Sequence, residues 1–320
     1  MSGVYTVFRK ELADHFSSYR FIILFALIAM VSLITVYMAG TSLREALQGV
    51  AKPRFVFLMI FTSTGALFSL SQFVAFFGPL IGLILGFDSI NRERTSGTLS
   101  KIVSQPIYRD SIINGKFLAG VTTIAIILTS ILLLVSGIGL RLLGVVPGIE
   151  EVLRVAIYFA ISLFYISFWL AISILFSVLF RSIATSALAS VALWIFFSFF
   201  VTLGANVMAN VIAPLDNKED RGIETISKHV RTQRTISLFS PMSLYSDSTA
   251  TIINPMKKTT RSFVLMGPME KASSERFQNP LPLIQSLFVV FPYITILIAI
   301  TMISFIITYS TFMLQEVRSV

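Results

Sequence analysis

The chain has 320 residues, of which 55% are hydrophobic and only 13% are charged. Soluble domains carry roughly 25% charged residues, so this composition excludes an ordinary soluble protein and indicates a membrane protein. The formal net charge of +9 does not indicate nucleic-acid binding, because the basic residues flank hydrophobic segments and form no stripe interleaved with aromatic residues. The chain has no cysteine, which excludes disulfides and thiolate metal sites.

Residues 1–20 precede the first long apolar run and are predicted to form an amphipathic helix in the membrane interface. Its apolar residues recur at helical spacing, whereas Arg9, Lys10 and Asp14 lie off that stripe. No small-residue cleavage site follows, so we expect the segment to be retained. A single histidine on such a helix, His15, is expected to be structural. The residues of the apolar stripe are Val4, Val7, Phe8, Leu12, Phe16 and Tyr19.

Six apolar runs are each long enough to cross a bilayer, which requires about 20 residues at 1.5 Å per residue. Apolar residues run through them without alternation, so helices are predicted and barrel strands are not. The fold class is therefore an all-α polytopic membrane protein. The predicted spans are Phe21–Gly40, Leu67–Phe87, Phe117–Leu140, Val155–Phe180, Ile183–Gly204 and Ser286–Leu314.

None of these predicted spans contains Asp, Glu, Lys, Arg or His. A charge at the centre of a span costs about 2.5–3.5 kcal/mol on insertion scales, so it is retained only for a purpose such as an ion or proton relay. The absence of ionisable residues argues against a carrier driven by an ion gradient. Some sodium carriers use only carbonyl and hydroxyl oxygens, so a secondary transporter remains an alternative.

The distribution of basic residues predicts the orientation of the chain. Ten lie in the short segments on one side and five on the other, which predicts that both termini are cytoplasmic. We expect the membrane to be the plasma membrane of a prokaryote. Spans one to five then occupy residues 21–204, and residues 286–320 form the last span and a cytoplasmic tail. Between them, residues 205–285 form an extracytoplasmic segment, for which we expect short helices, some turned back toward the membrane, and a candidate surface for an external partner.

Enzyme chemistry finds no support in the sequence. The two histidines, His15 and His229, are far apart and occur without an H-E-x-x-H pattern, so a zinc peptidase has no ligand set. There is no G-x-x-x-x-G-K-[ST] loop, so ATP would have to bind to another chain. Four methionines outside the membrane, without His or Cys beside them, do not indicate a copper site. The chain is expected to be a non-catalytic protein without a cofactor of its own.

The most informative segment is 88–116, between spans two and three. It begins with Asp88, Arg92, Glu93 and Arg94 as the second span leaves the membrane. A short amphipathic helix follows, which is predicted to end at Pro106. Such a helix at the membrane face is suited to dock into a groove of a partner. Its apolar face comprises Leu99, Ile102 and Val103.

This segment resembles the signature of permeases of ATP-binding cassette (ABC) exporters with six spans per subunit, the type V class. The class includes drug, lipid and polysaccharide exporters and the copper-processing permeases of denitrifiers. The matching positions are Glu93, Gly97-Thr98-Leu99, Pro106, Arg109 and Gly115-Lys116, with Ser240-Pro241-Met242-Ser243-Leu244-Tyr245 and Asn254-Pro255 in the outer segment.

The resemblance implies that the cytoplasmic segment is a coupling helix. Two ABC ATPase subunits carrying ATP and Mg would dock on it, and a second permease chain, identical or homologous, would complete the transporter. The implied coupling residues are Arg92, Glu93, Arg94, Gly97, Thr98, Leu99 and Ile102. Arg109 and Lys116 are expected to contact lipid headgroups instead.

Two further patterns concern helix packing and a transport path. Gly78, Gly82 and Gly86 form a stripe on the second span, which predicts close helix packing or a seam that moves. In similar exporters the second and fifth spans line the substrate cavity. The implied path residues are Phe76, Phe77, Trp194, Phe197 and Phe200. Phenylalanines that simply face lipid are an equally good interpretation of the same pattern. An uncharged aromatic wall suits an amphiphilic or apolar substrate.

A function of another class stays open. A membrane-anchored assembly or sensor protein would bind partners through residues 205–285 without transporting anything. An ABC ATPase encoded beside this chain would favour the permease.

Overall fold

The computed structural model describes residues 2–49, 54–62, 69–98, 108–214, 223–258 and 279–315, and all regular structure in these ranges is helical. The helices of this part are α1 (Ser2–Ser17), α2 (Tyr19–Ala46), α3 (Val56–Thr62), α4 (Leu70–Gly86), α5 (Asn91–Thr95), α7 (Arg109–Leu143), α8 (Ile149–Leu179), α9 (Ile183–Ile195), the π-helix η1 (Phe196–Phe200), α10 (Val201–Ile212), α11 (Ile223–Ser237), α12 (Pro241–Ile253) and α14 (Leu283–Leu314).

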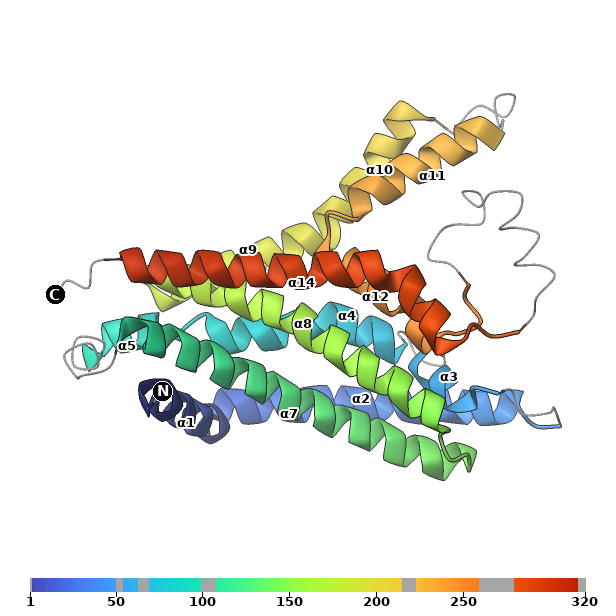
Figure 1. Cartoon of the computed structure of the whole chain (residues 1–320), viewed down its shortest axis with the longest axis horizontal. Coiled ribbons are helices and arrows are strands. Elements are labelled where there is room, and N and C mark those ends of the chain that lie inside the picture. The colour runs from blue at the N-terminus through green and yellow to red at the C-terminus, as the bar shows by residue number, and fades with distance from the viewer. Residues whose placement is uncertain are drawn as a thin grey trace.

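Six helices of the described part are long and apolar enough to cross a membrane, which confirms the predicted number of spans. Five of them and α9, the first part of the other, lie side by side in one bundle, and the N-terminal helix lies at the same end of the bundle as α5 and the end of α14 (Figure 1). The predicted end of the fifth span at Gly204 is too early. The helix continues from α9 through η1 and α10 to Ile212, because apolar residues such as Val207 and Val211 extend beyond Gly204.

Helix α8 is the centre of the bundle and contacts α4, α7, α9, α12 and α14. Its contact with α4 uses the predicted glycine stripe. A Cβ atom on Gly82 would lie 2.6 Å from the carbonyl oxygen of Ile166, and one on Gly86 would lie 2.7 Å from the Cβ atom of Ser173. Only a glycine fits at these approaches, so α4 and α8 pack backbone to backbone.

Local signals explain where several helices begin and end. The Ser69 hydroxyl accepts the backbone N–H of Gln72, whose side chain accepts the N–H of Ser69, so a capping box starts α4. The Glu151 carboxylate accepts the N–H of Gly148 at the start of α8. Helix α7 ends where Gly144 adopts a left-handed conformation with φ +60°.

The described residues of segment 205–285 form two different parts. Helices α10 and α11 pair into a hairpin that extends away from the bundle (Figure 1), whereas α12 packs against α3, α4, α8 and α14. The hairpin is fixed at its base by Arg234 of α11, which contacts Asp247 of α12 at 3.0 Å and the hydroxyl of Tyr293 in α14 at 2.9 Å. Segment 205–285 is thus partly integrated into the bundle.

Candidate functional site

Helix α5 is a single short turn that follows directly from the second span. It ends at Thr95, and Gly97, two residues later, has φ +67°, a left-handed conformation that favours glycine. The Glu93 carbonyl accepts the hydroxyl groups of Ser96 at 3.3 Å and Thr98 at 3.2 Å, and these two hydroxyl groups lie 2.8 Å apart. The turn that leads into the predicted coupling segment is therefore held by its own side chains.

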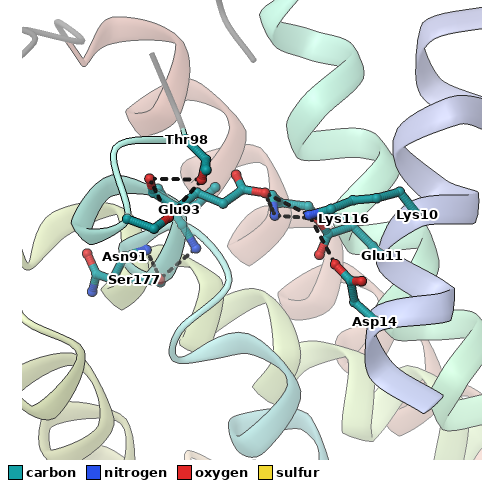
Figure 2. A network of polar contacts seen from close by, with 10 residues as sticks. Lys10, Glu11, Asp14, Asn91, Glu93, Thr98, Lys116 and Ser177 are labelled. Atoms are coloured by element: carbon teal, nitrogen blue, oxygen red, sulfur yellow. Dashed lines mark hydrogen bonds and ion pairs between the residues drawn. The ribbon is translucent and has the colours of Figure 1, made fainter. Parts of the chain in front are cut away.

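The carboxylate of Glu93 lies in a buried ion network that joins three helices (Figure 2). Lys116 Nζ of α7 lies 3.0 Å from Glu93 Oε1 and 2.8 Å from Glu11 Oε1 of α1. Lys10 Nζ contacts the same two oxygens at 3.1 and 2.8 Å and also reaches Asp14 at 3.1 Å. Two lysines thus share two carboxylates, and α1, α5 and α7 meet at this point.

The contacts within the network stabilise the charged forms of Glu11 and Lys10. Burial alone would raise the pKa of Glu11, but the ammonium groups of Lys116 and Lys10 outweigh burial and lower the pKa to about 2. For Lys10, burial acts to lower the pKa, and the contacts with Glu11 and Glu93 raise it above its usual value. The pKa of His15 is lowered, mainly by burial, which favours the neutral imidazole. The Thr123 hydroxyl donates to Ala119, so His15 Nδ1, 3.0 Å away, is the donor to Thr123.

Polar contacts also fix α5 and its approach to three more helices. The backbone N–H groups of Ile90 and Asn91 donate to the Ser177 hydroxyl of α8 at 3.0 and 3.1 Å. Asp88, just before α5, pairs with Arg20 of α2 at 3.0 Å. Arg94 donates to the Gln315 side chain at the end of α14, at 2.8 Å. Helix α5 and the residues around it are therefore connected to α1, α2, α7, α8 and α14.

The structure separates the predicted coupling residues into two groups. Arg92 and residues 95–98 are exposed, whereas Glu93 is only 7% exposed. Direct contact of the Glu93 carboxylate with an ATPase is inconsistent with this burial, and its contacts hold α5 in place instead. Arg94 is half-buried and bonded within the chain. Leu99 and Ile102 lie outside the described residues.

The prediction that Lys116 contacts lipid headgroups is wrong, because Lys116 is 4% exposed and ion-paired within the protein. Arg109, the other predicted anchor, donates to the Gln315 carbonyl at the end of α14, at 3.1 Å. Sequence analysis missed the partner Glu11. The spacing could have identified Glu11, because it lies four residues after Val7, on the side of α1 that packs against α7.

A second buried cation lies at the opposite end of the bundle. Arg154 of α8 is fully buried, and its guanidinium stacks on the Phe55 ring at 5.4 Å. Its acceptors connect the end of α12 with the start of α14. They are the carbonyl oxygens of Thr251 at 3.2 Å, Ile252 at 3.2 Å and Leu281 at 2.6 Å, the Ser286 hydroxyl at 3.1 Å and the Glu150 carboxylate at 2.9 Å.

The predicted path residues form a connected aromatic cluster only in part. The Phe76 ring lies 4.9 Å from Phe77 and 5.2 Å from Trp194, so these three residues of α4 and α9 meet. Phe197 packs near Trp169 of α8 at 6.4 Å. Phe200 is 60% exposed and stacks on Phe196 along the outer face of the helix. The structure thus brings together Phe76, Phe77 and Trp194 and leaves Phe200 apart.

Comparison with known proteins gives one family and two relatives. A family model described as ABC-2 family transporter protein matches residues 5–317. A protein of Pseudomonas aeruginosa named "Probable ABC transporter permease protein NosY" is 28% identical over 151 residues, which are 47% of this chain and 49% of the relative. A protein of the same name from Stutzerimonas stutzeri is 28% identical over 168 residues, 52% of this chain and 54% of the relative. The chain spans about half the length of the curated relatives it matches.

Proposed function

The chain belongs to the ABC-2 family of transporter proteins, and we propose that it is the membrane-spanning permease subunit of an ATP-driven exporter. Two separate ABC ATPase subunits bind ATP and Mg and dock at the α5 end, which faces the cytoplasm. A second permease chain, identical or homologous, completes the path. The names of the two relatives, both ABC transporter permeases, support this proposal.

The observation that carries the proposal is the set of polar contacts around α5. A chain without its own ATP site needs a part that receives movement from a partner and passes it to the membrane helices. Glu93 joins α5 to α1 and α7, and Ser177 joins it to α8. Displacement of α5 therefore acts on several helices at once, which supports a role in transmission.

The surface offered to the ATPase is the exposed side of this turn, formed by Arg92 and residues 95–98. Arg92 supplies a positive charge there, whereas Glu93 points into the ion network. Docking and transmission are thus assigned to adjacent residues of one helix. A substitution on the surface and one in the network are expected to have different effects.

Co-purification with an ABC ATPase encoded beside this chain tests the proposal. Arg92→Glu is expected to reduce the amount of bound ATPase at least fivefold by reversing the surface charge. Glu93→Gln is expected to retain the ATPase but to weaken the link between hydrolysis and transport in vesicles. Arg9→Glu, an exposed arginine of α1, is the matched control and should bind normally. Unchanged binding by Arg92→Glu would contradict docking at α5.

The substrate is proposed to be amphiphilic or apolar, because the aromatic residues Phe76, Phe77 and Trp194 meet between α4 and α9. Transport of fluorescent amphiphiles in vesicles containing both subunits measures this directly. Phe76→Ala is expected to lower transport severalfold while ATPase binding stays unchanged. Phe200→Ala, on the exposed face of η1, is the control.

A further inference from the structure

A regular series of polar contacts joins α14 to α8, which lie side by side in the bundle (Figure 1). The donors are seven residues apart in and just after α14, and their acceptors are carbonyl oxygens seven residues apart in α8. Helices that run in the same direction and pack along one seam meet at this spacing. The contacts are Thr301 with Phe164 at 3.2 Å, Thr308 with Ala171 at 3.0 Å and Gln315 with Val178 at 3.0 Å.

The two threonines of this series can release α8 at little cost. Thr308 Oγ1 also lies 2.7 Å from the Ser304 carbonyl oxygen, and Thr301 Oγ1 lies 2.8 Å from that of Leu297. Each hydroxyl group has one hydrogen, so it can turn from α8 to the carbonyl oxygen four residues before it in α14. The α8 carbonyl oxygens that it leaves also accept backbone N–H groups of their own helix. The contact between the helices is therefore specific in register but easily broken.

Gln315 makes the last contact of the series and connects further helices. Val178 is among the last four residues of α8, whose carbonyl oxygens lack a partner within the helix, and Gln315 Nε2 supplies one. Gln315 Oε1 accepts a hydrogen bond from Arg94 of α5 at 2.8 Å, and its backbone carbonyl accepts one from Arg109 of α7 at 3.1 Å. One residue thus joins the ends of α5, α8 and α14 to the start of α7.

The two arginines that bind Gln315 flank the predicted coupling helix in the sequence. Arg94 precedes that helix, and Arg109 follows its predicted end at Pro106. Both sides of the predicted coupling segment are therefore tied to the end of α14. The beginning of α5 is tied to α8 instead, through the Ser177 hydroxyl. A push on the segment would tilt α5 about these bonds and displace Arg94 at its other end, together with Gln315.

The opposite end of α14 is fixed. The Ser286 hydroxyl accepts a hydrogen bond from Arg154 at 3.1 Å, and the Ser286 carbonyl accepts one from the Thr251 hydroxyl at 3.0 Å. Pro292 lies within α14, between this junction and Thr301. A proline removes one hydrogen bond from the interior of a helix, so α14 can bend at this point. The helix thus has a fixed end, a point of bending and a part that α8 holds only loosely.

We propose that Gln315 passes the movement of the coupling segment to α14, whose part near α5 swings on α8 about Pro292. Displacement of α5 carries Arg94 and Gln315 with it, and the threonine hydroxyl groups release α8 in the same step. The end of α14 at Arg154 stays in place. The proposal rests on the proposed function, because the ATPase supplies the movement. Gln315 is a positioning residue, since it acts through Arg94.

Distances between spin labels test the swing, and the chain has no native cysteine that would also be labelled. Leu314→Cys with Leu179→Cys places labels on exposed positions at the α5 end of α14 and α8. Ile284→Cys with Leu153→Cys is the matched pair on the same helices at the opposite end. Labelled chain is diluted with unlabelled chain, so that only distances within one chain are measured.

The complex with its ATPase is measured without nucleotide and with ATP and Mg bound to an ATPase variant that cannot hydrolyse ATP. The mean distance of the pair at the α5 end is expected to change by roughly 3–5 Å, the scale of helix shifts in switching proteins. The pair at the opposite end should keep its distance, because the Arg154 junction holds α14 there.

Substitutions of Gln315 assign the swing to its side chain. Gln315→Met removes both side-chain hydrogen bonds at similar length, so the change at the α5 end should fall at least twofold. Gln315→Glu keeps an acceptor for Arg94 and loses only the donor to Val178, so it should retain the change. Arg94→Met should act like Gln315→Met, and the double variant should be no worse than either, because all three lose the same contact. ATPase binding, measured in parallel, shows that each variant is folded.

Two results would overturn the proposal while the chain still binds its ATPase. Equal changes at the two ends would mean that α14 moves as a rigid rod. An undiminished change in Gln315→Met would mean that another residue transmits the movement. Failure of the unsubstituted chain to bind an ATPase would instead refute the proposed function, and the role of Gln315 with it.

Discussion

The two ends of the bundle each bury one cation, but they neutralise it in different ways. At the α5 end, Lys116 is held by two carboxylates from α1 and α5, and Lys10 shares them. At the opposite end, Arg154 pairs with one carboxylate, that of Glu150, and its other acceptors are the Ser286 hydroxyl and three backbone carbonyl oxygens, two in α12 and one just before α14. Carboxylates titrate and belong to side chains that can rotate, whereas carbonyl oxygens do neither.

This difference indicates which end is suited to change. An ion network with shared partners keeps some neutralisation when one helix shifts, because each lysine retains one carboxylate. The contacts of Arg154 are lost when one helix shifts, because its planar guanidinium fits only one arrangement of α8, α12 and α14. The α5 end is thus built for movement between helices, and the Arg154 end for a fixed junction.

Replacement of Arg154 is expected to have the largest effect on stability. Arg154→Met leaves the carbonyls of Thr251, Ile252 and Leu281 without their donor, at about 1–3 kcal/mol for each unsatisfied group, or roughly 3–9 kcal/mol in total. Arg154→Lys keeps the charge but supplies fewer donors, so its loss should be intermediate. Unfolding in mixed detergent micelles measures both. A fully stable Arg154→Lys protein would show that charge, and not the fork of donors, holds this junction.

Replacement of Lys116 should also destabilise the protein strongly, but a second substitution should restore part of the stability. Lys116→Met leaves Glu11 and Glu93 buried with only the half-exposed Lys10, and the loss of one partner from a buried pair costs about 3–5 kcal/mol. Adding Glu11→Gln should restore part of that stability, because a carboxylate without a counter-ion is removed. The matched double variant Arg154→Met with Glu150→Gln should gain little. Equal rescue at the two ends would remove the distinction between them.

The sequence predicted more of the fold than of the site, for a physical reason. The number of spans follows from the length of local apolar runs, so it could be predicted along the chain. The ion network depends on distant residues: Glu11 meets Lys116 across 105 positions of sequence. Lys116 and Arg154 lie just outside the predicted apolar runs, where a basic residue is usually assigned to headgroups. Only the tertiary structure shows that both turn inward.

The ion network at the α5 end should make the stability depend on pH, because the pKa of Glu11 is lowered. Its folded pKa is about 2 against an ordinary value of 4.5, so its contribution is complete above pH 4.5 and is lost as the pH falls toward 2. At pH 7 the wild-type protein should therefore be more stable than Glu11→Gln by roughly 3–3.5 kcal/mol, since one pKa unit corresponds to about 1.4 kcal/mol. The difference should shrink below pH 4.5. A difference that is independent of pH down to pH 2.5 would mean that Glu11 acts through packing.

The smallest expected effect concerns His15, which links α1 to α7 beside the network. Burial lowers its pKa, although the nearby Glu11 acts in the opposite direction, so the unfolded chain takes up the proton first as the pH falls. The contribution of a group with a lowered pKa is complete above its unfolded value and declines below it, here below about pH 6.5. His15→Gln retains a donor for Thr123 but does not titrate. Wild type should lose stability relative to this variant between pH 7.5 and 5.5, by less than the Glu11 effect. The opposite slope would mean that the carboxylates, and not burial, set the charge of His15, and that the network extends one turn further along α1.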